Sequence, residues 1–196
     1  SISVSVNPST FASNCRGANN MIEFVRQRDK IVKSLVALNA DVVGLMEIQN
    51  NGDTAVSYLV GSINAALGGP VYSVVPMPPA TGTDAIRVAM IYKPSVVTLA
   101  GASMSDGDDL NNRPPMAQTF KATNGARFSV VVNHLKAKAS CPGGTGPDTD
   151  RGDGQGCWNA LRVQQAQRLA TVFIPQVKAS AGDDDVLVIG DMNAYG

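Results

Sequence analysis

The alternation between two hydrophobic periods along the chain constrains its fold more than any other feature of the sequence. Residues 22–38 carry apolar side chains at helical spacing, namely Phe24, Ile31, Leu35 and Leu38. The next stretch, residues 41–48, is a short apolar run rich in strand formers, and polar residues and a glycine follow it. We therefore expect an amphipathic helix followed by a buried strand whose tail emerges into a turn.

The same alternation continues to the last residues of the chain. Two further helices are expected, over residues 56–67 with a Gly-Gly cap and over residues 159–173 with Pro175 ending or kinking the helix. Between them, turn residues separate five short β-rich segments: 71–75, 86–92, 96–99, 116–121 and 128–133. Residues 186–189 are expected to form a last buried strand. Helices that flank such strands predict a layered α/β sandwich.

Length and composition limit the class of protein. A chain of 196 residues suits one domain with a hydrophobic core. No apolar run approaches the ~18 residues that a membrane-spanning helix needs, so we expect a soluble protein without a membrane partner. The formal net charge is zero, which argues against a strong, non-specific DNA clamp. An enzyme that contacts a phosphodiester through a metal ion and a few arginines stays compatible with this composition.

Three cysteines are present, Cys15, Cys141 and Cys157. The last two bracket a loop of Gly, Asp, Thr and Pro residues that has no apolar periodicity and cannot pack by itself. A Cys141–Cys157 disulfide would close this loop and stabilise it by about 3 kcal/mol, whereas the alternative is three ordinary buried thiols. A disulfide would indicate a secreted, extracellular or periplasmic protein. Residues 1–20 carry no signal-peptide pattern, so the numbering is expected to begin after a processed or trimmed N-terminus.

Polar residues occur at the ends of three of the expected strands. They are Glu47, His134, Asp191 and Asn193. Ligands of α/β sheets bind at the carboxyl ends of strands, so we expect these side chains to converge. A carboxylate within an apolar run is costly unless it is paired or bound to a metal, so Glu47 is either half of a salt bridge or a metal ligand.

The residue types at these strand ends fit Mg²⁺ or Mn²⁺ better than zinc. Carboxylates, an amide and waters are hard oxygen ligands, whereas structural zinc needs Cys and His at close spacing. His134 is the single histidine of the chain. A lone histidine is more often structural, but its place at a strand edge beside cations favours a functional role. Ca²⁺ is a second candidate cation, near Asp148, Asp150 and Asp153, for which a solvated acidic loop is the alternative.

Several segments resemble motifs of the endonuclease/exonuclease/phosphatase superfamily, of which deoxyribonuclease I is a member. Residues 38–47 are similar to the segment with the metal-binding glutamate, residues 133–136 to the first catalytic-histidine segment, and residues 190–193 to the Gly-Asp-x-Asn segment. Other stretches resemble the secreted bacterial nucleases of this superfamily in particular, namely residues 15–19, 26–32 and 154–159. The resemblance covers nearly the whole chain and implies two β-sheets packed between helices.

The resemblance also implies roles for the strand-end residues. Glu47 would bind the divalent cation, and Asp191 and Asn193 would hold or orient the scissile phosphate and the attacking water. His134 would donate a hydrogen bond to a phosphate oxygen or protonate the leaving oxygen. Lys136 is a further candidate for binding the substrate phosphate.

Three more residues are candidates because of their place in the matched pattern. Arg113 lies where relatives carry a phosphate-contacting arginine, although a surface loop arginine is the alternative. Asp84 lies where relatives place a residue near the metal site, and an ordinary turn residue is its alternative. Asn7 would be a metal ligand if residues 2–7 form the first strand of the family. The aromatic-Asn pattern is absent there, however, and a proline follows Asn7.

The family pattern has a second half that this sequence does not contain. A late aspartate and a C-terminal Asp-His pair, which activate the water, are expected beyond Gly196. Residues 1–196 are therefore expected to be the N-terminal and central part of one endonuclease/exonuclease/phosphatase domain, truncated after the Gly-Asp-x-Asn motif. This part alone is expected to need the missing C-terminal segment of the same protein for turnover.

The function predicted from the sequence is divalent-metal-dependent hydrolysis of phosphodiester bonds in nucleic acid, most specifically by an extracellular DNA endonuclease. Two alternatives stay open. One is a phosphodiesterase of the same fold that acts on a phospholipid or an inositol phosphate. The other is an inactive binding domain that retains the fold.

Overall fold

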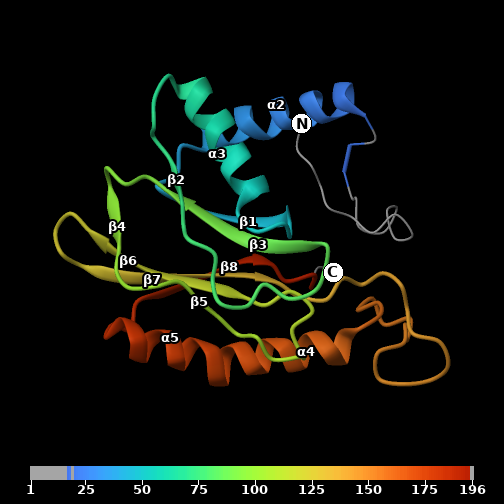
Figure 1. Cartoon of the computed structure of the whole chain (residues 1–196). Coiled ribbons are helices and arrows are strands. Elements are labelled where there is room, and N and C mark those ends of the chain that lie inside the picture. The colour runs from blue at the N-terminus through green and yellow to red at the C-terminus, as the bar shows by residue number, and fades with distance from the viewer. Residues whose placement is uncertain (1–16, 19, 195–196) are drawn as a thin grey trace.

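Two β-sheets packed face to face form the centre of the molecule, and helices cover both outer faces. The computed structural model describes residues 17–18 and 20–194. In Figure 1, one sheet is covered by two helices near the N-terminus, α2 (Met21–Leu38) and α3 (Thr54–Leu67). The other sheet is covered by α4 (Asn159–Arg168) and α5 (Ile174–Ala181). This arrangement confirms the predicted sandwich of two sheets between helices.

Helix α2 begins and ends as its sequence predicts, but its buried face is narrower. The side chain of Asn20 accepts a hydrogen bond from the backbone N–H of Glu23, and Asn39 ends the helix in the left-handed conformation. Val32 is buried, whereas Ile31 is 49% exposed and Leu38 60% exposed. The expectation that both of these residues belong to the buried stripe was therefore wrong.

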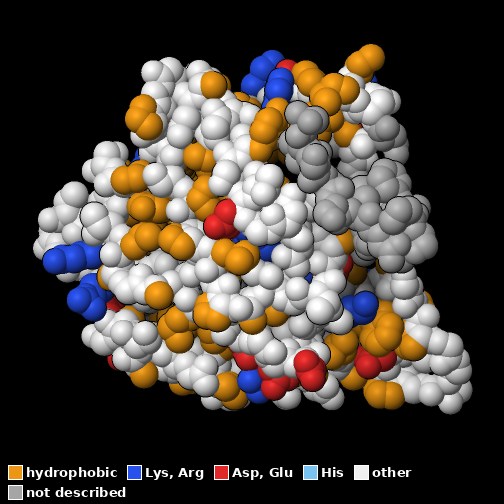
Figure 2. Space-filling model, in the orientation of Figure 1, with side chains coloured by type: hydrophobic (Ala, Val, Ile, Leu, Met, Phe, Trp, Pro, Cys, Tyr) orange, Lys and Arg blue, Asp and Glu red, His pale blue; other side chains and the backbone are white. Residues whose placement is uncertain are grey.

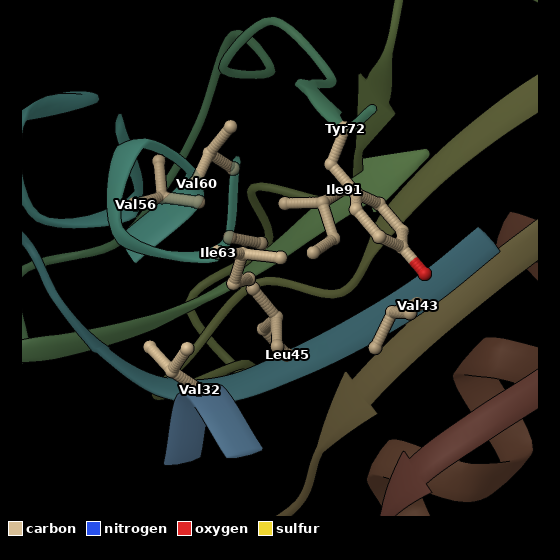
Figure 3. Packing of buried hydrophobic residues seen from close by; sticks show 9 residues of the cluster. Val32, Val43, Leu45, Val56, Val60, Ile63, Tyr72 and Ile91 are labelled. Carbon is tan, nitrogen blue, oxygen red and sulfur yellow. The ribbon is translucent and has the colours of Figure 1, made fainter. Parts of the chain in front are cut away.

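The first sheet consists of antiparallel strands in the order β1-β3-β2. Their bounds are β1 (Val42–Gln49), β3 (Ile86–Tyr92) and β2 (Ser73–Val74). Figure 3 shows the core between this sheet and its two helices, in which Val56 and Ile63 of α3 pack against Leu45 and Ile91. Helix α3 ends at Gly68, whose positive φ of 76° suits a left-handed cap.

The second sheet has the order β4-β6-β7-β8, with β5 paired to the other part of β6. The strands are β4 (Val97–Leu99), β5 (Met104–Ser105), β6 (Met116–Ala122), β7 (Arg127–His134) and β8 (Val186–Asp191). All of these pairs are antiparallel except β7 with β8, which is parallel. The parallel pair aligns the carboxyl ends of β7 and β8. Strand β5 is the one strand of this sheet that the sequence did not predict.

Gly44 of β1 allows the two sheets to approach each other. A Cβ atom at this position would lie 2.7 Å from Cδ1 of Ile189 and 2.8 Å from Cγ2 of Val132, both in the second sheet. The core between the sheets is formed by buried apolar side chains, among them Val88, Met90, Met116, Phe120, Val130 and Val132. The absence of a side chain at position 44 therefore sets how closely β1 packs against β7 and β8.

The helical layer on the second sheet is longer than residues 159–173. The π-helical segment η2 (Leu169–Phe173) joins α4 to α5, so the helix continues past Pro175. Pro175 lies in the first turn of α5, where its missing N–H is not needed, and the wider π turn accommodates the change of hydrogen bonding. Of the two expected outcomes, a helix that ends at Pro175 is therefore wrong, whereas a kink at Pro175 stays a prediction.

Strand β8 is less buried than its apolar sequence predicts. Leu187 is 58% exposed, and Val188 and Ile189 are each 38% exposed. Among the described residues β8 pairs with β7 alone, so its second edge has no neighbouring strand. The expectation of a buried last strand was therefore wrong for this part of the molecule. None of the described helices is both long enough and apolar enough to cross a membrane.

Candidate functional site

The parallel pairing of β7 with β8 brings His134 and Asp191 together. The two residues are register partners, and the backbone N–H of Leu135 donates to the Asp191 carbonyl oxygen at 2.9 Å. His134 Nε2 lies 3.9 Å from Asp191 Oδ2, and the side chain of His134 is 4% exposed whereas that of Asp191 is 46% exposed. In Figure 1, the carboxyl ends of β1, β7 and β8 lie at the same end of the sandwich. The expected convergence of strand-end residues is therefore present for these two.

Glu47 reaches this end of the molecule through a β-bulge. The register between β1 and β3 shifts between Leu45 and Ile48, and Glu47 within the shift has a φ of 59°. Its side chain is exposed, which differs from the expected carboxylate enclosed in a buried strand. A positive φ is strained for a residue with a side chain, and bulges of this kind re-aim side chains beside active sites. Neither a hydrogen bond nor an ion pair joins the Glu47 carboxylate to the described part of the chain.

Asn193 is fixed by the turn that follows β8. Its backbone N–H donates to Asp191 Oδ1 at 2.8 Å, and its side-chain Nδ2 donates to the Leu135 carbonyl oxygen at 3.0 Å. The residue is 8% exposed and has a φ of 50°. The Gly-Asp-x-Asn motif therefore ties the end of β8 to the segment after β7, and it places Asn193 beside His134.

Arg113 is buried beneath the site rather than exposed on a loop. Its Nε donates to the His134 carbonyl oxygen at 3.3 Å, and its Nη2 donates to the Leu135 carbonyl oxygen at 2.7 Å. Its Nη1 forms an ion pair with Asp84 Oδ2 at 3.1 Å. The surface-loop alternative is excluded, because Arg113 is 7% exposed. A direct phosphate contact of Arg113 stays a prediction, whereas the contacts present hold the backbone at His134 in place.

The surroundings of His134 lower its pKa below the ordinary value of 6.5. Burial is the largest cause, and the positive charge of Arg113 is the next. The negative charges of Asp191, Glu47 and Asp84 act in the opposite direction without reversing the shift. The net shift therefore favours the neutral form of His134. Its Nδ1 is buried and has no hydrogen-bond partner among the described residues.

Two polar residues of α4 that the sequence analysis did not single out hold the loops around the site. Gln165 Oε1 accepts from the backbone N–H of Lys136 at 3.0 Å, and its Nε2 donates to the Leu110 carbonyl oxygen at 2.8 Å. Arg162 donates to the carbonyl oxygens of Lys136 and Cys157. Both residues are 3% exposed. A polar side chain on the inner face of an amphipathic helix was the signal that could have identified them.

The cysteine-bracketed loop is closed by a Cys141–Cys157 disulfide with a Cα–Cα distance of 5.2 Å. The predicted pairing is therefore present, whereas Cys15 lies outside the described residues, as does Asn7. Trp158 follows the disulfide directly, and Lys136 Nζ lies 4.7 Å from the centroid of its ring. Lys136 is thus held beside the site, over an aromatic side chain that belongs to the matched stretch 154–159 but was not named as a site residue.

The carboxylates of the three aspartates proposed for Ca²⁺ each accept a backbone hydrogen bond. Asp148 Oδ1 accepts from the backbone N–H of Leu161, Asp150 Oδ1 from Gly152, and Asp153 Oδ1 from Gln155. Within the described ranges, no group of three or more His, Cys, Asp or Glu side chains is arranged to hold a metal ion. The three carboxylates accept from separate backbone groups, two within local turns and one in the first turn of α4, so they do not form the expected calcium-binding group.

The absence of such a group among the described residues also restricts which side chains can hold a metal ion at the strand ends. Asp84 does not join Glu47 and Asp191 in a group of carboxylates, because its Oδ2 pairs with Arg113. Mg²⁺ needs only one or two protein carboxylates and keeps several waters. The exposed, unpaired carboxylate of Glu47 and the half-exposed carboxylate of Asp191 fit such an open site. The donor set is compatible with a hydrated hard cation, and the role of Glu47 as its ligand stays a prediction.

A sequence model of the endonuclease/exonuclease/phosphatase family matches residues 12–195. The chain therefore belongs to the endonuclease/exonuclease/phosphatase family. No curated protein matches the sequence significantly.

Solved structures with the same fold include the human Nocturnin catalytic domain with a bound sulfate anion. It has a TM-score of 0.59 and 20% identity over 89% of this chain and 59% of that chain. ANGEL2, a 2′,3′-cyclic phosphatase, has a TM-score of 0.59 and 17% identity over 95% and 48% of the two chains. Humanised D. rerio TDP2 has a TM-score of 0.57 and 16% identity over 92% and 65%. This chain thus spans less than two thirds of each neighbour, and the similarity shows the fold.

Proposed function

We propose that this chain carries the phosphate-binding and metal-binding side of an active site that hydrolyses phosphodiester bonds in nucleic acid, as a divalent-metal-dependent DNA endonuclease. One observation carries the proposal. A buried, neutral His134 faces Asp191 across the parallel ends of β7 and β8, and Glu47 projects from a strained bulge at the same end of the sandwich. Membership of the endonuclease/exonuclease/phosphatase family supports it.

Each residue has a distinct role in the proposed reaction. Glu47 would hold Mg²⁺ or Mn²⁺, which when bound supplies Lewis-acid stabilisation of the charged phosphoryl oxygens. Asp191 and Asn193 orient the attacking water and the phosphate. The water oxygen forms the new bond to phosphorus while the bond to the leaving oxygen breaks, and the leaving oxygen takes up a proton.

The lowered pKa of His134 supports one of the two roles predicted for it. An imidazole that is neutral at pH 7 carries no extra proton to give to the leaving oxygen. It can donate a hydrogen bond from Nε2, the nitrogen that faces Asp191, to a phosphoryl oxygen of the substrate. We therefore propose that His134 stabilises charge in the transition state and is not the proton donor.

The group that activates the water is not among the residues that the structure describes at this site. We propose that a further segment of the same protein supplies it, as the family pattern implies. Two observations support this proposal: the chain spans 48–65% of its structural neighbours, and the second edge of β8 is unpaired in the described part of the molecule. Activity assays are therefore designed for the full-length protein.

The test is nicking of supercoiled plasmid DNA by the full-length protein with Mg²⁺ and then with a chelator. We expect chelator-sensitive nicking, and Glu47→Ala and His134→Ala are each expected to reduce it by about 10²-fold or more. Asp184→Ala is the matched control, because Asp184 is 90% exposed and pairs only loosely with Lys178. Absence of cleavage of both plasmid and single-stranded DNA by the unmodified protein would reject the proposal. Release of a phospholipid head group or of phosphate from an inositol phosphate would then favour that alternative, and divalent-ion binding without any hydrolysis would favour the inactive binding domain.

We also propose that the protein acts outside the cell or in the periplasm, as do the secreted bacterial nucleases that its motifs resemble. The Cys141–Cys157 disulfide supports this location, because such bonds persist in oxidising compartments. Mass spectrometry of the protein from its native source, alkylated without reduction, should show the linked peptides. Fully alkylated Cys141 and Cys157 would contradict the proposed location.

A further inference from the structure

We infer that Trp158 and Lys136 form a nucleotide platform beside His134, on which the indole ring stacks against a base of single-stranded nucleic acid while the lysine pairs with the neighbouring phosphate. The inference rests on the proposed function and deepens it, because it names the form of the substrate. The observation that carries it is the position of Lys136 Nζ, 4.7 Å from the centroid of the Trp158 ring.

The indole ring of Trp158 is held in a fixed orientation at the protein surface. Its Nε1 donates to the carbonyl oxygens of Ala139 and Ser140, at 3.2 Å and 3.0 Å. The side chain is partly exposed, and both hydrogen bonds leave from the ring edge. The polar group of the indole is therefore satisfied by the protein, and the faces of the ring are the parts that can bind a ligand.

The backbone around Trp158 is built to keep this orientation. Trp158 has a φ of 63°, a left-handed conformation that is unfavourable for a large side chain. The disulfide at Cys157 precedes it, and its own N–H donates to the Asp148 carbonyl oxygen at 2.8 Å. Arg162 then links the Cys157 and Lys136 carbonyl oxygens, at 2.7 Å and 3.2 Å. Such strain persists where the surroundings over-determine it, which is typical of functional sites.

The platform adjoins the proposed reaction centre along the chain. Lys136 follows His134 by two residues, a separation of at most about 7 Å along an extended chain. In Figure 1, the loop that leads into α4 lies at the same end of the sandwich as the carboxyl end of β8. A nucleotide stacked on Trp158 would therefore adjoin the phosphate that contacts His134.

The charges around the site favour an approach of the phosphate backbone over this platform. A separate cleft is lined by Asp84, Asp108 and Asp109, and the first two form ion pairs with Arg113 and Arg168, so these two arginines are already engaged by carboxylates. On the face drawn in Figure 2, acidic and basic side chains are interspersed, and no continuous basic surface is present. Binding of a nucleic-acid substrate to this protein thus depends on local contacts more than on a positive electrostatic potential over the whole surface.

Stacking on Trp158 favours unpaired bases over bases that are already stacked in a duplex. Every base has a π face, so stacking on tryptophan tolerates all sequences, but paired bases in a duplex are already stacked on each other. Base stacking on an aromatic ring is stronger than an exposed cation–π contact. A base can therefore displace the ammonium group from the ring, and Lys136 then pairs with the phosphate of the same strand.

Intrinsic fluorescence tests the platform without any catalytic turnover. Trp158 is the single tryptophan of the 196 residues, and the quenching that is lost when Trp158→Phe is added in the full-length protein isolates its contribution. Three probes are titrated into the full-length His134→Ala protein with Mg²⁺: a single-stranded oligonucleotide, an abasic oligonucleotide of the same length and charge, and a duplex. We expect saturable quenching by the single strand and little by the abasic strand or the duplex. Equal responses to the single and abasic strands, or no response to either, would overturn the inference.

Variants in the otherwise unmodified protein test the same contact during catalysis. Trp158→Ala should raise KM for single-stranded DNA about 5-fold to 100-fold with little change in kcat, and Trp158→Phe should retain most of the affinity. Lys136→Gln should make the salt dependence shallower by about 0.7 in the logarithmic slope, as expected for one phosphate contact to a single strand. Tyr58→Ala is the matched control, because Tyr58 packs on Phe24 in α2, away from the site. An unchanged KM in Trp158→Ala would also reject the platform.

The two proposals fail in different ways. If the protein nicks DNA in a chelator-sensitive manner but responds equally to the single and abasic strands, the platform is wrong and the nuclease proposal stands. If no DNA is cleaved but the single strand alone quenches Trp158, the platform stands and the proposed catalytic function is wrong. Circular dichroism and the intact Cys141–Cys157 disulfide serve as the folding control for each variant.

Discussion

The backbone of Gly190 lies against the backbone of Asn133, its register partner on the parallel strand β7. A Cβ atom at position 190 would overlap the carbonyl oxygen of Asn133 and lie 2.8 Å from its nitrogen. Gly190 also has a φ of 131°, a conformation that side chains rarely adopt. The glycine of the Gly-Asp-x-Asn motif is thus required by the close approach of two strands, and this approach places Asp191 beside His134.

Replacement of Gly190 by alanine should destabilise the protein by at least about 2 kcal/mol, because neither backbone can yield without separating β7 from β8. The free energy of unfolding in urea measures the change. Gly61→Ala in α3 is the matched control: no heavy atom lies near its Cβ position, and alanine in a helix is expected to stabilise by up to about 1 kcal/mol. Equal effects at the two positions would contradict the structural reason given for Gly190.

Gly44→Ala should destabilise the contact between the sheets by about 1–3 kcal/mol, since the added methyl group would collide with side chains of the second sheet. The collision is with the flexible end of Ile189, so Ile189→Val should relieve part of it. A double-mutant cycle of these two substitutions, followed by urea unfolding, should therefore show favourable coupling. Strictly additive effects would indicate that Gly44 and Ile189 do not touch in solution.

The pKa of His134 should lie below 6.5, because burial and Arg113 outweigh the nearby carboxylates. The imidazole of His134, the single histidine of the 196 residues, can be followed by NMR during a pH titration, with His134→Gln identifying its signals. Asp191→Asn removes a negative charge that raises the pKa, so the midpoint should move further down. A midpoint at or above 6.5 in the unmodified protein would contradict the environment described here.

The same shift gives a signed prediction for stability. The unfolded chain binds a proton at His134 at a higher pH than the folded protein, so the free energy of unfolding should fall as the pH decreases through 6.5. This loss should be complete below the folded-state pKa, and the contribution should be fully present above 6.5. His134→Gln should lack this component, and an identical pH dependence in the variant would assign it to other groups.

Removal of the Arg113 side chain should affect both stability and His134. Arg113→Ala leaves the His134 carbonyl oxygen and Asp84 without this donor, at a cost of about 1–3 kcal/mol for each group that stays buried and unsatisfied. Because the positive charge of Arg113 lowers the pKa of His134, the NMR midpoint should rise in this variant. Asp84→Asn keeps an oxygen acceptor for Arg113 and should be milder. Unchanged stability in Arg113→Ala would reject its positioning role.

The sequence predicts best the helices and strands whose structure is determined by residues close to one another along the chain. The helical period of residues 56–67 and the apolar run of residues 86–92 determine α3 and β3 almost to the residue. Pro175 was misinterpreted because the π-helical turn that accommodates it depends on packing against the second sheet. The exposure of Leu187 could not be predicted either, since an apolar strand has the same sequence at the centre of a sheet as at its edge.

The candidate site also has features that the sequence predicts and features that it does not. Sequence alone determined the chemical identity of the strand-end residues, including His134 and Asp191, because polar groups after apolar strands are a local pattern. Only the tertiary structure decided their geometry: the parallel register that pairs the two residues, the bulge that exposes Glu47, and the burial that keeps His134 neutral. It also brought Trp158 beside Lys136, across 22 positions of sequence, because a disulfide and a buried arginine close a loop that has no periodicity of its own.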